Sequence, residues 1–147
     1  MIELLLCLCI ISILLSISIC KFYLKDYKID SFVRQLCTDI RYVRIKNINS
    51  DYSTYIYYKK KPNGVNSYVL REDGKDKKEV ELPQNTDIYY SCSKVIFNLT
   101  GSLNYQGDTI VIIDRDNNKK REITIIPFSG RTLIKECIYK YGEDIYE

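Results

Sequence analysis

Hydrophobic residues fill the first twenty positions of the chain with few interruptions. Residues 4–20 contain no charged residue, no proline and no glycine. A helix rises roughly 1.5 Å per residue, so this run extends about 26 Å, close to the ~30 Å thickness of a bilayer's hydrocarbon core. Only a helix can satisfy its own backbone polar groups in lipid. The pattern therefore predicts a transmembrane half of a helix over residues 1–24.

One acidic residue, Glu3, lies at the start of this apolar run. A carboxylate next to lipid is costly unless it finds a partner, which makes Glu3 a candidate functional residue. The alternative is that Glu3 lies at the level of the head groups and is solvated. The residues themselves leave both interpretations open.

From residue 25 to residue 50 the apolar positions follow the period of a helix. They recur at steps of three and four residues: Ile29, Phe32, Val33, Leu36, Cys37, Ile40 and Val43. This spacing places them on one face, as in an amphipathic helix. The segment Asn47-Ile48-Asn49-Ser50-Asp51 is a stop signal. We predict that 25–50 continues the first helix, with a bend near residues 21–25 as the alternative.

Beyond residue 53 the period changes to two, which is typical of β-strands. The predicted strands are 55–58, 67–71, 79–82, 87–90, 94–98, 109–113, 122–126 and 132–134. Polar turns separate them, and Gly101, Gly107 and Gly130 are predicted to be turn residues with positive φ. We predict an α+β fold in which the long helix packs on an antiparallel meander over 51–138. Residues 139–147 are a polar tail.

Ile2-Glu3-Leu4-Leu5, followed by the uninterrupted aliphatic stretch, resembles the N-terminal methylation segment of type IV pilins and pseudopilins. In that family a basic leader and the sequence Gly-Phe-Thr come shortly before the Ile-Glu-Leu part. They do not precede it here, so we expect a leader upstream of Met1, and no prepilin-peptidase site can be assigned within these residues. The resemblance implies that Glu3 acts in assembly, by pairing with the N-terminal amine of a neighbouring subunit.

Three later segments extend the resemblance. Residues 95–102, 107–112 and 123–131 are similar, in this order, to segments of H-type minor pseudopilins and of minor pilins from competence pili. Together with the N-terminal segment they cover most of the chain. The resemblance implies a non-enzymatic minor pilin or pseudopilin subunit that assembles through its N-terminal helix.

The same resemblance implies the setting of the protein. Its partners would be other pilin-like subunits, the cytoplasmic membrane and, if an upstream leader exists, a prepilin peptidase. The machine would be a competence (DNA uptake) or type IV pilus, or alternatively a type II protein secretion system. A single-pass membrane-anchored extracellular binding domain, unrelated to filaments, is the remaining alternative.

The implied location is the cytoplasmic membrane, with the C-terminal domain outside it and a cell-surface filament after assembly. Lys21, Lys25 and Lys28 follow the apolar run. By itself the positive-inside rule would keep their side cytoplasmic. A basic leader upstream would reverse that balance.

Composition argues against catalysis, cofactors and metals. The chain has no His, which removes the usual general base and the commonest metal ligand. It also lacks phosphate-binding and nucleophile motifs, so we expect no enzyme activity, no small-molecule substrate and no cofactor. Asp114 and Asp116 could hold calcium weakly, but solvated turn charges are favoured.

Two basic clusters leave nucleic acid as a partner without firm support. They are Lys59-Lys60-Lys61, which has Tyr57 and Tyr58 beside it, and Lys119-Lys120-Arg121. Lysines next to aromatic rings can contact a phosphate backbone. The net charge is only +3, so solvated turns remain the favoured interpretation.

The six cysteines fall into two groups. Cys7, Cys9 and Cys20 lie in the apolar run, where they act as small hydrophobic residues. Cys37, Cys92 and Cys137 lie beyond it. Because an exported domain meets oxidising conditions, we predict a bridge between Cys92 and Cys137, with Cys37 as an equal candidate for either partner.

Overall fold

The computed structural model describes residues 2–60 and 66–138. Within these ranges the side chains of residue 5, of residues 17–25 and of residue 138 are not described. The predicted tail over 139–147 and most of the predicted turn after Lys60 lie outside the described residues. The chain divides into two units, Met1–Phe32 and Val33–Glu147.

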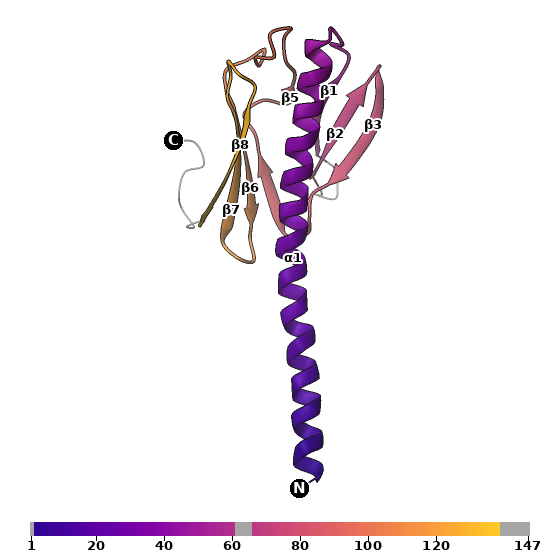
Figure 1. The fold of residues 1–147 in the computed structure, drawn as a ribbon, viewed down its shortest axis with the longest axis vertical. Helices are drawn as coiled ribbons and strands as arrows, with labels where there is room; N and C mark the ends of the chain where they lie inside the picture. The colour runs from indigo at the N-terminus through magenta and orange to yellow at the C-terminus, as the bar shows by residue number, and fades with distance from the viewer. Residues whose placement is uncertain (1, 61–65, 139–147) are drawn as a thin grey trace. The chain divides into compact units, whose positions relative to one another are not determined.

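One long helix begins the chain. The helix α1 runs from Ile2 to Ile48, and its last sixteen residues belong to the second unit (Figure 1). The helical assignment is continuous, so the predicted single helix is confirmed and the alternative of two helices is not. The predicted stop signal is confirmed as well.

The C-terminus of α1 is held by the fully buried side chain of Asn47. Its Nδ2 donates to the carbonyl oxygens of Asp51 at 2.6 Å and Thr54 at 2.9 Å. Its Oδ1 accepts from the backbone N–H of Phe97 at 2.8 Å. The end of a helix leaves backbone groups without partners inside the helix. Here the side-chain amide of Asn47 bonds both to the segment that follows the helix and to Phe97, which is distant in sequence.

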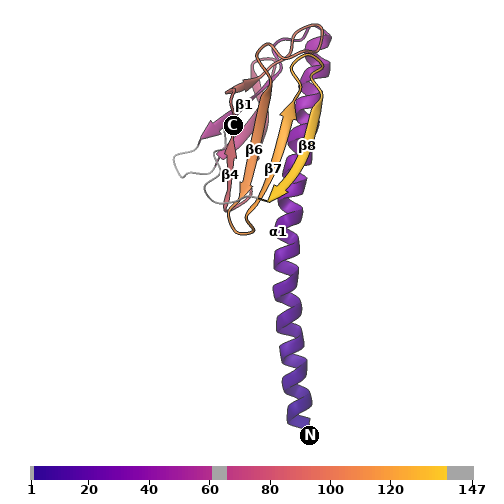
Figure 2. The same ribbon diagram turned by 90° about the vertical axis from the view of Figure 1, so that its left-hand side faces the viewer.

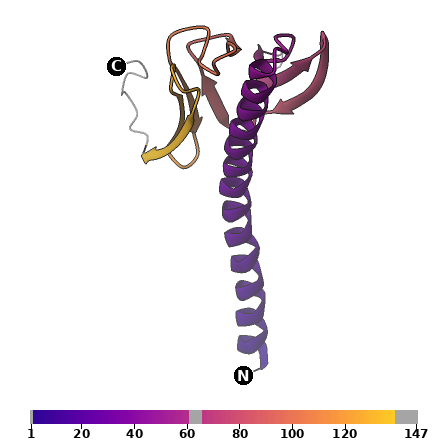
Figure 3. The ribbon, with the colours of Figure 1, turned by 45° about the horizontal axis from the view of Figure 1, so that its top comes forward.

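Eight strands follow the helix: β1 (Tyr55–Lys60), β2 (Asn66–Glu72), β3 (Lys75–Glu81), β4 (Thr86–Tyr89), β5 (Lys94–Val95), β6 (Asp108–Asp114), β7 (Lys119–Ile125) and β8 (Thr132–Ile138). They form two four-stranded sheets with the orders β3-β2-β1-β5 and β4-β6-β7-β8. Neighbouring strands are antiparallel throughout. The sheets lie on two sides of the last turns of α1 (Figure 3).

The α+β class is confirmed, but the single meander is wrong. β4 does not continue the first sheet beside β3; it pairs with β6, beside which it lies in Figure 2. Pro83, which has no N–H to donate, follows the end of β3 and interrupts the ladder there. The chain then returns to the first sheet at β5, which pairs with β1.

The core of the second unit lies between α1 and both sheets. From α1 it takes Val33, Leu36, Cys37, Ile40 and Val43, and from the strands it takes, among others, Ile56, Tyr68, Val95, Ile110, Ile112, Ile123 and Ile125. In β7, burial alternates with partial exposure along the strand, as the period of two predicts. The amphipathic face predicted from Val33 onward is therefore confirmed.

Two glycines allow a close approach of loops beside α1. Gly101 and Gly130 have φ values of 77° and 61°, so positive φ is confirmed for both. A Cβ on Gly130 would lie 2.2 Å from the carbonyl oxygen of Gly101, and that oxygen also accepts from Nε of Arg44 at 3.0 Å. Gly107 does not have a positive φ, so that prediction is wrong; a Cβ there would meet Pro127 at 3.1 Å.

The predicted bridge between Cys92 and Cys137 is not formed. Cys37, Cys92 and Cys137 are all free thiols. Cys92 follows Ser91, whose N–H donates to Asp108 at the first residue of β6. Cys137 pairs through Lys120 with Ile113, near the last residue of β6. The two cysteines therefore lie at opposite ends of the sheet, while a disulfide needs Cα atoms within about 7 Å.

Candidate assembly surface

The first unit exposes a large apolar surface. Its exposed aliphatic side chains are Ile2, Leu4, Leu6, Leu8, Ile10, Ile11, Ile13, Leu14 and Leu15, each at least 50% exposed. Successive residues of a helix point about 100° apart, so this N-terminal apolar surface surrounds the helix and is not a stripe. Contiguous apolar surface of this kind marks a site of contact with protein or lipid.

Glu3 lies in the first turn of α1 and its side chain is exposed. The N-terminus of a helix carries a partial positive charge that favours a carboxylate there. The structure thus places a single acid at the end of the N-terminal apolar surface. Whether Glu3 is solvated or paired with a neighbour stays a prediction.

Within this surface the side chain of Ser16 is satisfied inside the helix. The hydroxyl of Ser16 donates to the carbonyl oxygen of Ser12 at 2.8 Å. Such a bond lets serine lie in apolar surroundings without a free donor. Over the residues that the structure describes, no helix contains a stretch that is both long and apolar enough to cross a membrane.

In the second unit, Glu72 joins α1 to the first sheet. Its carboxylate accepts from the hydroxyl of Tyr42 at 2.9 Å and lies 2.7 Å from the ammonium of Lys46, both on α1. Lys77 of β3 forms a further ion pair with it. Hydrogen bonds from Lys46, Lys77 and Tyr42 lower the pKa of Glu72 from 4.5 to about 2.

We expect this cluster to make stability depend on pH. Because the pKa of Glu72 is lower in the folded chain, its contribution is fully present above about pH 4.5 and is lost as the pH falls toward about 2. Glu72→Gln should unfold more easily than wild type at pH 6, and the difference should shrink as the pH falls. Urea denaturation at pH 6 and pH 3 measures it; a difference that is unchanged at pH 3 would contradict this.

An acid of α1, Asp39, is buried against the same sheet. Its Oδ2 accepts from the hydroxyl of Tyr68 at 2.7 Å and lies 2.9 Å from Nζ of Lys78. Its Oδ1 accepts from Gln35 at 3.0 Å. Burial, followed by the bond to Asp39, raises the pKa of Tyr68, so this tyrosine remains a neutral donor.

The basic and acidic turns that we expected to be solvated contain buried charged side chains. Arg121 is only 3% exposed and lies 3.6 Å from Glu136, so the second basic cluster is not a fully solvated turn. Asp114 is also buried; its carboxylate accepts from the backbone N–H of Asp116 and the amide of Asn117 in the turn after β6. Among the described residues no group of three or more potential ligands could hold a metal ion.

No protein-family model and no curated protein matches this chain. The solved structure of the type IV minor pilin FimU from Pseudomonas aeruginosa superimposes with a TM-score of 0.55 at 12% identity, over 76% of this chain and 90% of that chain. The chain has a type IV pilin-like fold. The minor pseudopilin EpsH from the type 2 secretion system of Vibrio cholerae gives a lower TM-score of 0.47 at 9% identity, over 78% and 98%.

The pilin-like fold confirms the predicted family resemblance at the level of architecture. The sequence placed Glu3 and the aliphatic run on one helix, and the structure does the same. Sequence reasoning missed the contacts of Asn47 and the carboxylate cluster at Glu72. Their partners come from distant segments, so no local pattern marks them; the stop signal that contains Asn47 was the only indication.

Proposed function

We propose that this chain is a non-enzymatic, pilin-like subunit of a type IV filament system. The observation that supports it best is the N-terminal apolar surface, which is exposed on all sides of a helix that continues into a pilin-like fold. A helix that is apolar all round needs lipid or other helices around it. A filament core built from such helices supplies that environment, and the folded unit would face outward.

The assembly sequence follows from these parts. The helix first anchors the chain in the cytoplasmic membrane, with the C-terminal domain outside. If a leader precedes Met1, a prepilin peptidase would cleave it. The helix then packs against those of other pilin-like subunits, where Glu3 pairs with the N-terminal amine of a neighbour. Two opposite charges in apolar surroundings fix register because either one alone is strongly penalised.

Among the machines of this class we favour a competence or type IV pilus. The chain uses Tyr, Ile, Lys and Asn heavily, which is typical of AT-rich genomes, including those of Gram-positive bacteria. A minor pseudopilin of a type II secretion system is the alternative, as is a membrane-anchored extracellular binding domain. Genes for a secretion ATPase and other Ile-Glu-Leu proteins beside this one would favour a filament.

A fractionation experiment tests the proposal. The chain, with its native upstream sequence, is produced in its source bacterium and in a strain that lacks the assembly ATPase. We expect it in the sheared filament fraction of the first strain and only in the membrane fraction of the second, by immunoblot at equal total amount. Recovery from the membrane alone in both strains would favour the anchored binding domain.

A further inference from the structure

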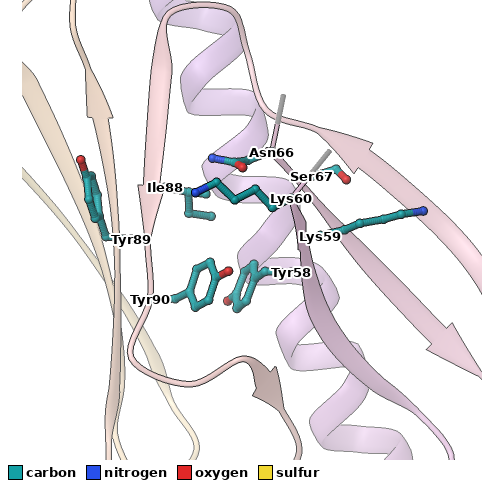
Figure 4. A pocket seen from close by; sticks show the side chains of 8 residues that line it. All are labelled: Tyr58, Lys59, Lys60, Asn66, Ser67, Ile88, Tyr89 and Tyr90. Carbon is teal, nitrogen blue, oxygen red and sulfur yellow. The ribbon is translucent and has the colours of Figure 1, made fainter. Parts of the chain in front are cut away.

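The second unit contains a pocket where the two sheets meet. It has a volume of about 240 Å³ and lies between the end of β1, the start of β2, and β4 with Tyr90. Figure 4 shows its lining: Tyr58, Lys59, Lys60, Asn66, Ser67, Ile88, Tyr89 and Tyr90. Pockets for drug-sized ligands begin at about 300 Å³, so this one suits a single ring with its substituents.

Aromatic and aliphatic side chains form one wall. The rings of Tyr58 and Tyr90 stack with their centroids 4.1 Å apart and their planes 14° apart, and Ile88 lies above them in the view of Figure 4. Burial, and secondarily the charge of Asp108, raises the pKa of Tyr58 well above its usual value. Tyr58 therefore stays uncharged, and the wall offers apolar area to one face of a ring.

Polar groups form the opposite side. Lys60 extends across the pocket toward Ile88, and the amide of Asn66 lies above it (Figure 4). The hydroxyl of Ser67 donates to Glu79 at 2.8 Å and lies on the other face of the first sheet, together with its cross-strand neighbour Lys59. A cation and an amide together suit a ligand that carries hydroxyl groups and one negative charge.

Lys59 and Lys60 differ in their availability. Lys59 points away from the pocket in Figure 4, and its ammonium lies 3.7 Å from the carboxylate of Glu79. For Lys60 no ion pair is found within the described part of the chain. Among the described residues, the positive charge that faces the pocket is that of Lys60.

We propose that this pocket binds the terminal ring of an acidic glycan, a sugar ring that carries a single carboxylate. The ring would lie against Tyr58, Tyr90 and Ile88, its carboxylate against Lys60, and its hydroxyls against Asn66. This inference does not depend on the filament function.

The surrounding charges favour a single carboxylate over a nucleic-acid backbone. A polyanion binds through several cations in a row, and each phosphate contact adds a counterion-release term. Here Lys59 lies on the other face of the first sheet, where it pairs with Glu79, so it does not extend the positive charge of Lys60 into a row. A ligand with one charge needs no second cation.

Titration of the full chain in detergent micelles tests the proposal. The probes are glucuronate, glucose, inorganic phosphate and a short single-stranded oligonucleotide, followed by calorimetry and by amide shifts of the lining residues. We expect saturable glucuronate binding, with glucose and phosphate each at least about tenfold weaker, because each lacks one half of the recognised group.

Lys60→Gln and Lys59→Gln form a matched pair, because both remove one charge from adjacent residues of β1. Lys60→Gln should weaken glucuronate binding by about tenfold or more, and Lys59→Gln by less than about twofold. Equal losses in the two variants, tighter binding of the oligonucleotide, or no glucuronate binding at millimolar concentration would each overturn the proposal.

Discussion

Glu3→Leu should remove the chain from filaments and leave its folded unit intact. Glu3 lies in the first turn of α1, in the first unit, so its loss cannot disturb the core of the second unit. It also makes the apolar run more hydrophobic, so membrane insertion should not suffer. What is lost is the proposed pairing with a neighbour's N-terminal amine, which would then be unpaired in apolar surroundings.

The expected loss of filament assembly can be estimated from the cost of breaking buried ion pairs in other proteins. Removing one partner costs about 3 kcal/mol or more. That is a factor of more than about one hundred in a docking equilibrium. The measurement is the ratio of sheared-filament protein to membrane protein, with Glu3→Asp as a control that keeps the charge. Equal filament content for wild type and Glu3→Leu, at equal membrane level, would contradict the assembly role.

Asn47→Ala should strongly destabilise the second unit. The substitution removes three hydrogen bonds of a fully buried amide and leaves the carbonyls of Asp51 and Thr54 and the N–H of Phe97 to find other partners. A buried group without a partner costs about 1–3 kcal/mol. We expect the free energy of unfolding to fall by about 3–5 kcal/mol in total.

Asn49→Ala is the matched control, because Asn49 is exposed and lies just beyond the last residue of α1. Exposed substitutions of this kind change stability by about 0.5 kcal/mol or less. Urea denaturation followed by the near-ultraviolet signal of the tyrosines compares the two. Similar midpoints for Asn47→Ala and Asn49→Ala would show that the three hydrogen bonds are replaced by water at little cost.

Local patterns were enough to locate most elements. The end of α1, the positions of the strands and the buried face from Val33 to Val43 all follow from periodicity and turn residues, because each depends on neighbours in sequence. The partition into two sheets does not. Whether β4 pairs with β3 or with β6 depends on contacts between distant residues, and Pro83 indicated only that a ladder ends.

Glu3 and the pocket differ in the same way: local sequence identifies the first, and only the fold identifies the second. Glu3 is conspicuous because an acid interrupts an aliphatic run, so the sequence alone identified it. The pocket combines Tyr58 and Lys60 of the first sheet with Ile88 of the second. No spacing rule joins those residues, and the two lysines differ only in the direction of their side chains. The sequence alone therefore does not show which lysine of the cluster Lys59-Lys60-Lys61 faces the pocket.

The crossing of the chain between sheets sets an order of folding. β1, β2 and β3 are joined as successive hairpins, so each can pair soon after it is synthesised. β4 pairs only with β6, which follows later, and until then it is an unpaired edge. It is short and carries Asp87, and both features limit mispairing at edges. Arg115, in the turn after β6, pairs with Asp87. The charge of Asp87, which limits mispairing of β4, is therefore neutralised once β4 has paired with β6.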